Sequence, residues 1–153
     1  MDDSHWMSEA LAEARIAAEQ GDVPVGAVVV KDGEIIGRGH NRREIDGDPL
    51  AHAEIIALRQ ASESIEGWRL VGCSLYVTLE PCAMCAGALV NSRIDTLVFG
   101  TRDPKAGFCG SLGSLVTDER LNHRLGIREG VLQEECSSIL KRFFKALRNP
   151  PKG

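Results

Sequence analysis

The strongest constraint on the fold comes from two short motifs that lie apart in the sequence. His-Ala-Glu occupies residues 52–54, and Pro-Cys-Ala-Met-Cys occupies residues 81–85. Cys82 and Cys85 are spaced so that, on a helix, their side chains share one face and can bind a single metal ion. His52 has to reach the same ion from a different element. The chain must therefore fold so that two separate elements meet at one point.

Two cysteines and one histidine form an open zinc site. They leave one position of a tetrahedral site free for water, which is the pattern of catalytic zinc. Residues two apart lie on opposite sides of a helix, so His-x-Glu can serve one site only at a helix start. We therefore predict that His52 and Cys82 lie at helix N-termini directed at the metal. The positive ends of two helices would also stabilise a negatively charged cluster of two thiolates and hydroxide.

Glu54 is the predicted proton carrier of this site. Zinc with three neutral ligands lowers the pKa of bound water to about 7, and two anionic sulfur ligands should weaken that effect. A general base beside the water then becomes valuable. Glu54 can take a proton from water, pass it to a ring nitrogen and later protonate a leaving amine. His-x-Glu followed by Pro-Cys-x-x-Cys is the signature of zinc-dependent nucleobase deaminases. We therefore predict one zinc ion per chain.

Two other interpretations fit the cysteine pair alone. A thiol redox pair is one of them, but it does not require a His-x-Glu motif upstream. A structural zinc site is the other, and it needs a fourth protein ligand. The candidates for that ligand, none of which stands in a second short-spaced pair, are Cys73, Cys109, Cys136, His40 and His123.

Strands and helices alternate along the chain. This pattern predicts a single domain over residues 1–153, an α/β sandwich built around one sheet. We expect helices at 7–20, 51–62, from Pro81 onward and at 133–147, and strands at 23–30, 34–39, 73–79, 94–100 and 126–129. Lys-Asp-Gly at 31–33 predicts a hairpin turn. Residues 41–50 and 101–118 are expected to form connecting loops.

The charge distribution is uneven. The net charge of -4 excludes a wholly basic nucleic-acid surface, so any such contact must be a local patch. The last stretch of the chain carries only basic charges, at Lys141, Arg142, Lys145, Arg148 and Lys152. It indicates an anionic partner, with a solvated helix face as the alternative. Membrane spans and a signal peptide are not expected from the sequence, which predicts a cytoplasmic location.

Around these motifs the sequence resembles bacterial tRNA adenosine deaminases of the TadA type. The matching runs are Ala-His-Ala-Glu-Ile at 51–55, Leu-Tyr-Val-Thr-Leu-Glu-Pro-Cys at 75–82, Met-Cys-Ala-Gly-Ala at 84–88 and Ser-Arg-Ile at 92–94. Further matches are Arg-Asp at 102–103, Gly107, Gly-Ser at 110–111, Asn-His-Arg at 122–124 and Phe-Phe at 143–144. The likeness covers residues 10–147. The Cys-Ala-Gly-Ala run and the Phe pair fit this family better than free-base guanine deaminases.

The resemblance implies a fold and an activity. The fold would be the cytidine-deaminase-like three-layer α/β/α sandwich with a five-stranded mixed sheet. The protein would be a homodimer whose active sites lie near the subunit interface. Its substrate would be the wobble adenosine of a tRNA anticodon loop, which is converted to inosine. His52, Cys82 and Cys85 match the zinc ligands of the family, and Glu54 matches its proton shuttle.

The resemblance also implies substrate contacts. Asn41 matches a residue that touches the target base, and Asp103 and Lys105 fall where the family approaches the flipped nucleotide. Phe144 and Arg148 fall on a helix that contacts the anticodon loop. Without the resemblance, these positions would be assigned to a turn, a surface loop and an amphipathic helix whose Phe pair belongs to the core.

Two rival functions share part of the pattern. A deaminase of free bases or nucleosides would use every zinc residue, and only the basic, aromatic C-terminal helix and the Cys-Ala-Gly-Ala run count against it. A structural zinc or RNA-binding module would need the ligands but not Glu54. Incubation with an anticodon stem-loop separates the first rival from the RNA-editing hypothesis, and substitution of Glu54 separates the second.

Overall fold

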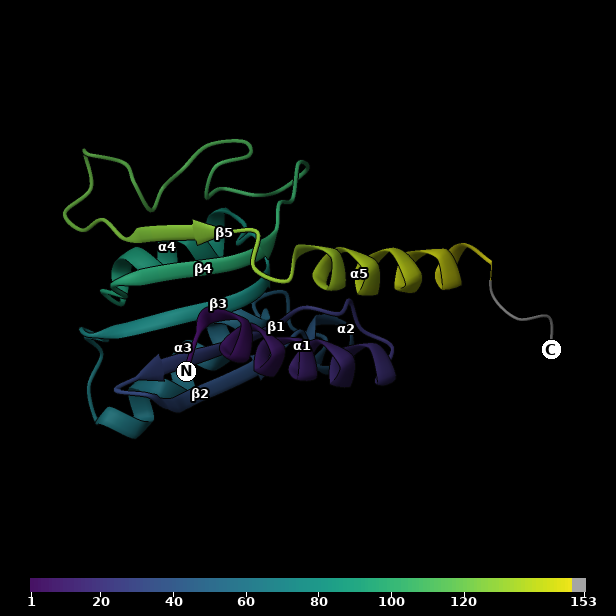
Figure 1. Ribbon diagram of the computed structural model, residues 1–153, viewed down its shortest axis with the longest axis horizontal. Coiled ribbons are helices and arrows are strands. Elements are labelled where there is room, and N and C mark those ends of the chain that lie inside the picture. Colours follow the sequence, from purple (N-terminus) through teal and green to yellow (C-terminus); the bar gives the residue numbers. More distant parts are fainter. Residues whose placement is uncertain (150–153) are drawn as a thin grey trace.

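One mixed sheet organises the chain in the computed structural model, which describes residues 1–149 (Figure 1). The strand order is β2-β1-β3-β4-β5. The strands are β1 (Gly26–Lys31), β2 (Glu34–His40), β3 (Cys73–Leu79), β4 (Thr96–Thr101) and β5 (Gly126–Glu129). Strand β1 pairs antiparallel with both β2 and β3, whereas β3, β4 and β5 run parallel. The predicted five-stranded mixed sheet is confirmed.

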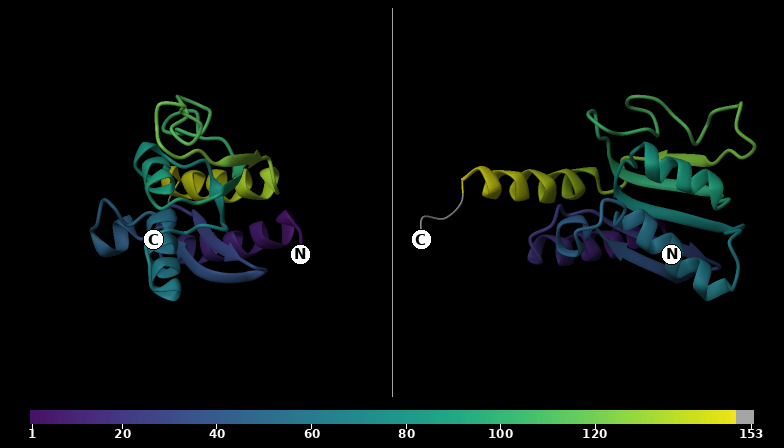
Figure 2. Two further views of the ribbon diagram at one scale, coloured as in Figure 1. Left: turned by 90° about the vertical axis from the view of Figure 1, so that its left-hand side faces the viewer. Right: turned by 180° about the vertical axis from the view of Figure 1, so that it is seen from behind.

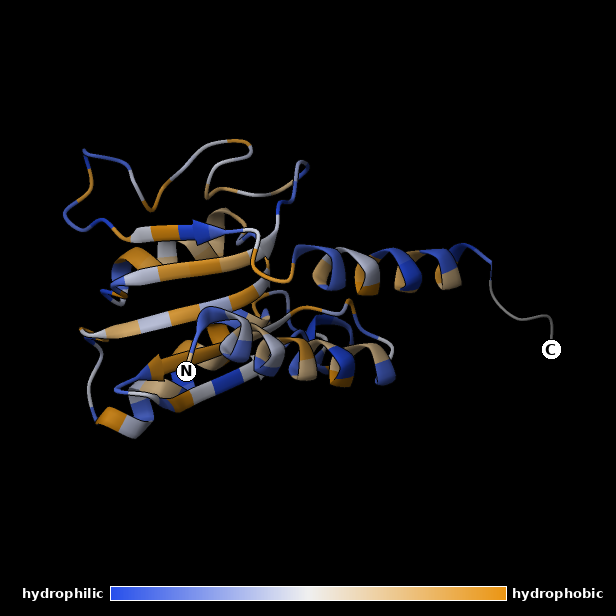
Figure 3. Cartoon of the chain, in the orientation of Figure 1, coloured by the Kyte–Doolittle hydropathy of each residue, from blue (hydrophilic) through white to orange (hydrophobic). Residues whose placement is uncertain are grey.

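Helices cover both faces of the sheet, as Figures 1 and 2 show. Helices α1 (Asp3–Glu19) and α5 (Gln133–Arg148) lie on one face, and α3 (Ala53–Ile65) and α4 (Ala83–Asn91) lie on the other. Successive strand residues point to opposite faces, so Val28 packs in the α1 and α5 layer while Val29 packs in the α3 and α4 layer. Apolar residues fill the central strands in Figure 3. The three-layer α/β/α sandwich is confirmed.

Most predicted elements are present with shifted ends. The strands at 73–79 and 126–129 have the predicted bounds, and positive φ values of 51° at Asp32 and 74° at Gly33 form the predicted hairpin turn. The first helix begins at Asp3 rather than residue 7, because Asp2 caps it by accepting a hydrogen bond from the His5 N–H at 3.0 Å. The predicted 41–50 loop contains a short helix, α2 (Arg43–Asp46).

The start of α3 is fixed by close contact with β2. Ala53, Ala57 and Ala61 recur at helical spacing along the face of α3 that is buried against the sheet. Opposite them, a side chain at Gly39 would place its Cβ 2.6 Å from the Ala53 carbonyl oxygen. Only glycine allows this approach, and it holds the first turn of α3 directly over the end of β2.

Helix α4 begins at the carboxyl end of β3, beside the end of β4. The Glu80 N–H donates to the Thr101 carbonyl at 2.9 Å, which keeps the two chain segments together beyond the strands. The carboxyl ends of two parallel strands and the N-termini of α3 and α4 therefore meet at one edge of the sheet. Such an edge is the usual place for a binding site in an α/β fold.

Helix α5 packs on the sheet only through its first half. Cys136 and Ile139 are buried, whereas Phe144 and Leu147 are 41% and 61% exposed. The second half extends past the edge of the sheet (Figure 1). Lys152, the last of the predicted basic residues, lies outside the described residues. Among residues 1–149, no helix has the length and apolar character needed to cross a membrane.

Candidate active site

The three predicted metal ligands converge at this edge. His52 is the N-cap residue of α3 and Cys82 is the N-cap residue of α4, as predicted, and neither side chain caps its own helix. Cys85 lies one turn into α4 and is fully buried. His52 Nδ1 lies 3.7 Å from Cys82 Sγ and 3.6 Å from Cys85 Sγ. The side chains are thus free to bind a common ion.

The spacing of these atoms fits a tetrahedral zinc site. Zinc bonds of about 2.3 Å to sulfur and about 2.0 Å to nitrogen, at tetrahedral angles, place a sulfur and a nitrogen ligand atom about 3.5 Å apart. The observed separations of 3.6 and 3.7 Å lie close to that value. All three ligand atoms lie within 4.8 Å of one another. The donor set therefore fits zinc in both chemistry and spacing.

Hydrogen bonds among the three ligand side chains shift their pKa values. Hydrogen bonds with Cys85 and His52 lower the pKa of Cys82 to about 3. The same contact with Cys82, together with burial, raises the pKa of Cys85, and the hydrogen bond to Cys82 raises the pKa of His52. A cation bound here would replace these shared protons, because metal ligands bind as thiolate and neutral imidazole.

No fourth protein ligand joins the cluster within residues 1–149. His40 Nδ1 contacts Glu13 at 3.0 Å, and His123 Nε2 contacts the Ile94 carbonyl at 2.7 Å. The other three cysteines lie outside the ligand group. The described residues thus form an open, three-ligand site, which argues against a closed structural zinc centre.

Glu54 lies in the first turn of α3, beside the ligands. Its side chain is 4% exposed and lines the pocket that contains His52 and Cys82. Burial raises the pKa of Glu54 to about 7, against the opposing effects of its own backbone N–H and of His52. A carboxyl group with this pKa can both accept and release a proton near neutral pH.

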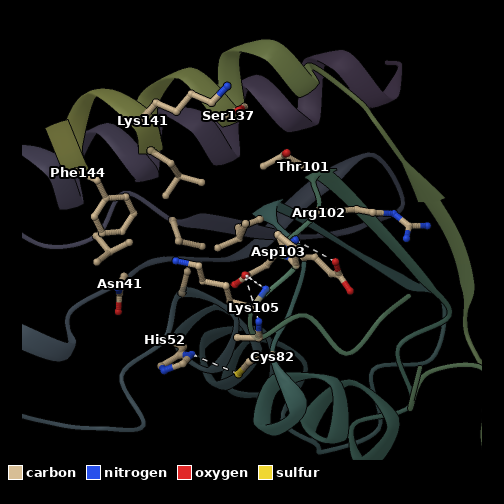
Figure 4. Close-up of a pocket in the computed structure, with 18 of the residues that line it drawn as sticks. Asn41, His52, Cys82, Thr101, Arg102, Asp103, Lys105, Ser137, Lys141 and Phe144 are labelled. Atoms are coloured by element: carbon tan, nitrogen blue, oxygen red, sulfur yellow. Dashed lines mark hydrogen bonds between the residues drawn. The ribbon is translucent and has the colours of Figure 1, made fainter. Parts of the chain in front are cut away.

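A pocket of about 700 Å³ leads from the ligands to α5 (Figure 4). That volume is typical of small-molecule sites and is large enough for a nucleotide. The ligands lie on one side of it, and Phe144 and Lys141 of α5 lie on the other, as the close-up shows. All nine predicted site residues except Cys85 line this pocket. Cys85 lies beneath it, in contact with His52.

Asn41 forms one wall of the pocket. It follows β2, is 7% exposed, and is held by a 3.0 Å hydrogen bond from its N–H to the Val25 carbonyl. The loop after Asn41 is anchored by Asp22, which is fully buried and accepts hydrogen bonds from the N–H groups of Glu44 at 2.9 Å and Ile45 at 3.2 Å. Asp22 was not among the residues predicted from the sequence.

Asp103 and Lys105 form the opposite wall, on the loop after β4. Asp103 accepts hydrogen bonds from the N–H groups of Lys105 at 3.0 Å and Ala106 at 3.2 Å. Its carboxylate therefore shapes the turn. Lys105 is exposed and lines the pocket.

Helix α5 contributes an aromatic ring and two basic residues. Phe144 is 41% exposed and faces the pocket, so the alternative that the whole Phe pair belongs to the core is wrong. Of the four basic residues in the described part of this helix, Lys141 and Arg148 line the pocket, whereas Arg142 and Lys145 do not. The helical period explains this division, since positions 141, 144 and 148 lie on one face.

Two further pocket residues were not predicted from the sequence. Arg43, in α2, is exposed at the mouth of the pocket. Glu80 is 2% exposed and precedes the cysteine motif. Burial alone would raise the pKa of Glu80, but hydrogen bonds from the Ser111 side chain and from three backbone N–H groups hold it below its ordinary value. Nothing in the sequence distinguishes Glu80 from an ordinary residue at the end of a strand.

Comparison with known proteins places this fold and site in one class. The model of the MafB19-like deaminase family matches residues 1–148. A guanine deaminase from Nitrosomonas europaea superposes with a TM-score of 0.79 over 92% of this chain and 83% of its own, at 24% identity, a likeness that shows the fold alone. The fold, the matched family and the open ligand site define a nucleobase-type deaminase.

More similar proteins narrow the class. A Bacillus subtilis tRNA-specific adenosine deaminase is 50% identical over 99% of this chain and 94% of its own length, and a Haemophilus influenzae relative of the same name is 49% identical over 98% and 87%. A solved tRNA:A34 deaminase, described as editing A to I at the wobble position, superposes with a TM-score of 0.86 at 43% identity over 89% of this chain and 99% of its own. The chain therefore belongs to the tRNA-specific adenosine deaminases.

Proposed function

We propose that the protein is a zinc-dependent hydrolase that converts the wobble adenosine of a tRNA anticodon loop to inosine. The observation that carries the proposal is the open His52, Cys82 and Cys85 site with Glu54 beside it, at the end of a nucleotide-sized pocket. The tRNA substrate comes from the relatives described above, and a cytoplasmic location is part of the same proposal.

The proposed reaction adds water at the adenine carbon that carries the amine and releases ammonia. His52, Cys82 and Cys85 would hold the zinc ion, which would supply Lewis acidity to the attacking water. Glu54 takes a proton from that water and delivers it to the adjacent ring nitrogen, which makes the carbon electrophilic. Glu54 then takes the remaining proton from the hydroxyl group added to the carbon and transfers it to the amine, so that the carbon–nitrogen bond breaks, ammonia leaves and a carbonyl forms. Its pKa of about 7 suits both directions of transfer.

The position of the site suits a base that has left its stack. Asn41 offers an amide to the edge of a base held beside Glu54. A hairpin loop makes extrusion of a base inexpensive, because the base is already unpaired. Nucleotides beside the extruded base would then lie along α5, where Phe144 offers a ring for stacking and Arg148 a charge for phosphate.

The direct test is incubation of the zinc-loaded protein with an anticodon stem-loop, followed by sequencing for inosine. Conversion of the wobble adenosine, with little turnover of free adenosine, guanine or cytosine, is the expected result. Preference for a free base over the stem-loop would replace this proposal with a small-molecule deaminase on the same fold.

Charge reversal on α5 is expected to weaken tRNA binding. Lys141→Glu combined with Arg148→Glu removes two cations that line the pocket, so stem-loop affinity should fall and its dependence on salt should become shallower by about two units of slope at most. Affinity is measured by fluorescence anisotropy across a salt series.

The matched control is Arg142→Glu with Lys145→Glu, which makes the same change in net charge on the same helix but off the pocket. It should retain more affinity and a steeper slope than the first double variant. Equal losses in both would mean that general charge, rather than the pocket-facing side of α5, attracts the RNA.

We also propose that the protein is a homodimer that associates through the face formed by α3 and α4. Trp68 is 55% exposed there, beside a shallow groove that includes Leu58 and Ala88. On α4, Ala83 is exposed, and a Cβ at Gly87 would meet nothing within 4 Å. A smooth, small-residue helix surface next to an exposed tryptophan suits close packing with a second copy of the chain.

Gly87→Arg should separate the subunits. The monomer has room for a side chain at this position, and replacing glycine favours the helix, so the fold should be preserved. Light scattering should give twice 16.6 kDa for the wild type and 16.6 kDa for the variant. A wild-type mass of 16.6 kDa at micromolar concentration would contradict the dimer.

A further inference from the structure

Glu80 lies between the metal ligands and the loop that forms one wall of the pocket. It follows β3, comes two residues before Cys82, and is 2% exposed. One carboxylate oxygen accepts the Asp103 N–H at 3.0 Å, and the other accepts the N–H groups of Cys109 at 3.0 Å and Ser111 at 2.9 Å. The Ser111 hydroxyl donates to the first oxygen as well.

The loop over residues 102–111 wraps closely around this carboxylate. A Cβ built at Gly107 would lie 2.5 Å from each Glu80 carboxylate oxygen, so the loop fits around Glu80 only because this residue is glycine. The Phe108 N–H donates to the Pro81 carbonyl at 2.9 Å, and Gly107 forms a β-bridge with Cys82. The loop is thus attached to the segment that starts α4.

The same loop supplies the pocket wall at Asp103 and Lys105. We infer that Glu80 is a positioning residue for the deaminase reaction: its carboxylate holds loop 102–111 against the start of α4, so that the substrate-facing wall and the metal ligands keep a fixed relative position. The effect on tRNA turnover rests on the function proposed above. The effect on the loop itself does not.

A carboxylate is the group that this position requires. Four donors converge on two oxygens, and hydrogen bonds to an ionised acceptor are stronger than those to a neutral one. In Glu80→Gln, one oxygen becomes an amide nitrogen, which cannot accept. Whichever way the amide is turned, two of the four donors lose their acceptor, and buried donors without acceptors are costly. The loop should therefore loosen at one or both of its ends.

The first measurement is amide hydrogen exchange in Glu80→Gln. Exchange at Asp103, Cys109 and Ser111 should speed up while strands β1 and β3 stay protected, and zinc content should remain one ion per chain. With the stem-loop, KM should rise more than kcat falls, and kcat/KM should drop roughly ten- to hundredfold, since small displacements of a positioning group have effects of this order. Glu80→Asp, which keeps the charge, should recover part of the loss.

Gly107→Ala provides an independent route to the same contact. Its added methyl group presses on the Glu80 carboxylate from the loop side. If both substitutions act on one contact, the double variant should lose little more than either single variant, a non-additivity that unrelated sites do not show. Ser111→Ala, which removes only the hydroxyl donor, should give a milder effect. It is the variant to measure if Glu80→Gln does not fold.

The matched control is Glu13→Gln. Glu13 is also a buried glutamate, 6% exposed, but its partners are the side chains of Arg38 and His40 on β2 rather than loop 102–111. It should leave loop exchange and the KM for the stem-loop near wild type. Unchanged loop exchange in Glu80→Gln, loss of zinc from it, or full additivity with Gly107→Ala would each overturn the inference. Failure of the wild type to edit the stem-loop would refute the proposed function, while the exchange result would still decide the role of Glu80.

Discussion

Replacement of Glu54 by glutamine is expected to abolish deamination while the protein stays folded and keeps its metal. The substitution preserves the size of a side chain that is 4% exposed, so packing should change little. It removes the group that we propose carries protons in both directions. General acid–base groups contribute about 10²–10⁴-fold each, and Glu54 acts more than once per cycle, so a loss of at least about 10³-fold follows. Single-turnover kinetics on an anticodon stem-loop measures it.

The control for this substitution is again Glu13→Gln, a buried glutamate that does not line the pocket. Zinc content and thermal unfolding of Glu54→Gln should match those of the wild type. Activity within tenfold of the wild type would refute the role of Glu54 as proton carrier. Loss of zinc in Glu54→Gln would instead indicate that this residue supports the ligands.

The candidate metal site could be predicted from the sequence because the chemistry of metal binding strongly restricts the geometry of the ligands. A histidine and two cysteines that bind one ion must meet, and His-x-Glu can serve that ion only from a helix start. His52 and Cys82 were therefore predicted at the N-termini of two helices, and in the structure they are the N-cap residues of α3 and α4. Local patterns likewise gave the hairpin at 31–33 and the bounds of β3 and β5.

Residues whose roles depend on contacts with distant loops could not be predicted from the sequence in this way. Glu80 acquires its partners from Asp103 to Ser111, and Asp22 acquires its partners from α2, which itself was expected to be a loop. No periodicity or spacing in the sequence marks such contacts, because they form only when the sheet brings the segments together. The charges alone did not determine which side of α5 faces the pocket, since its late charged residues are all basic, and only the family resemblance selected Phe144 and Arg148.

The buried carboxylates of Asp22 and Glu80 attach the walls of the pocket to the rest of the fold. The sheet and the helix N-termini provide a rigid floor for the ligands, while the walls are loops, which supply specificity in many enzymes. Asp22 anchors the wall that carries Asn41, and Glu80 anchors the wall that carries Lys105. Both walls are thereby fixed to the framework that holds the ligands.

Replacement of Cys82 by alanine is expected to remove the metal. The wild type should bind one zinc ion per chain, measured by elemental analysis after dialysis, because His52, Cys82 and Cys85 form the one metal-binding group within residues 1–149. Loss of a thiolate leaves two protein ligands, too few for a stable site. Since even groups outside the ligand set change metal affinity by about 10–100-fold, loss of a ligand should exceed about 100-fold and eliminate turnover.

Cys109→Ala is the matched control, since Cys109 is a buried cysteine, 2% exposed, that lies outside the ligand group. It should keep its zinc and its activity, whereas Cys82→Ala should lose both and regain neither when zinc is added at micromolar concentration. Full zinc retention in Cys82→Ala, or two zinc ions per wild-type chain, would show that the ligands have been assigned wrongly. Zinc loss in Cys109→Ala would show that the site has a fourth protein ligand, a third sulfur, which would close the position that the attacking water requires.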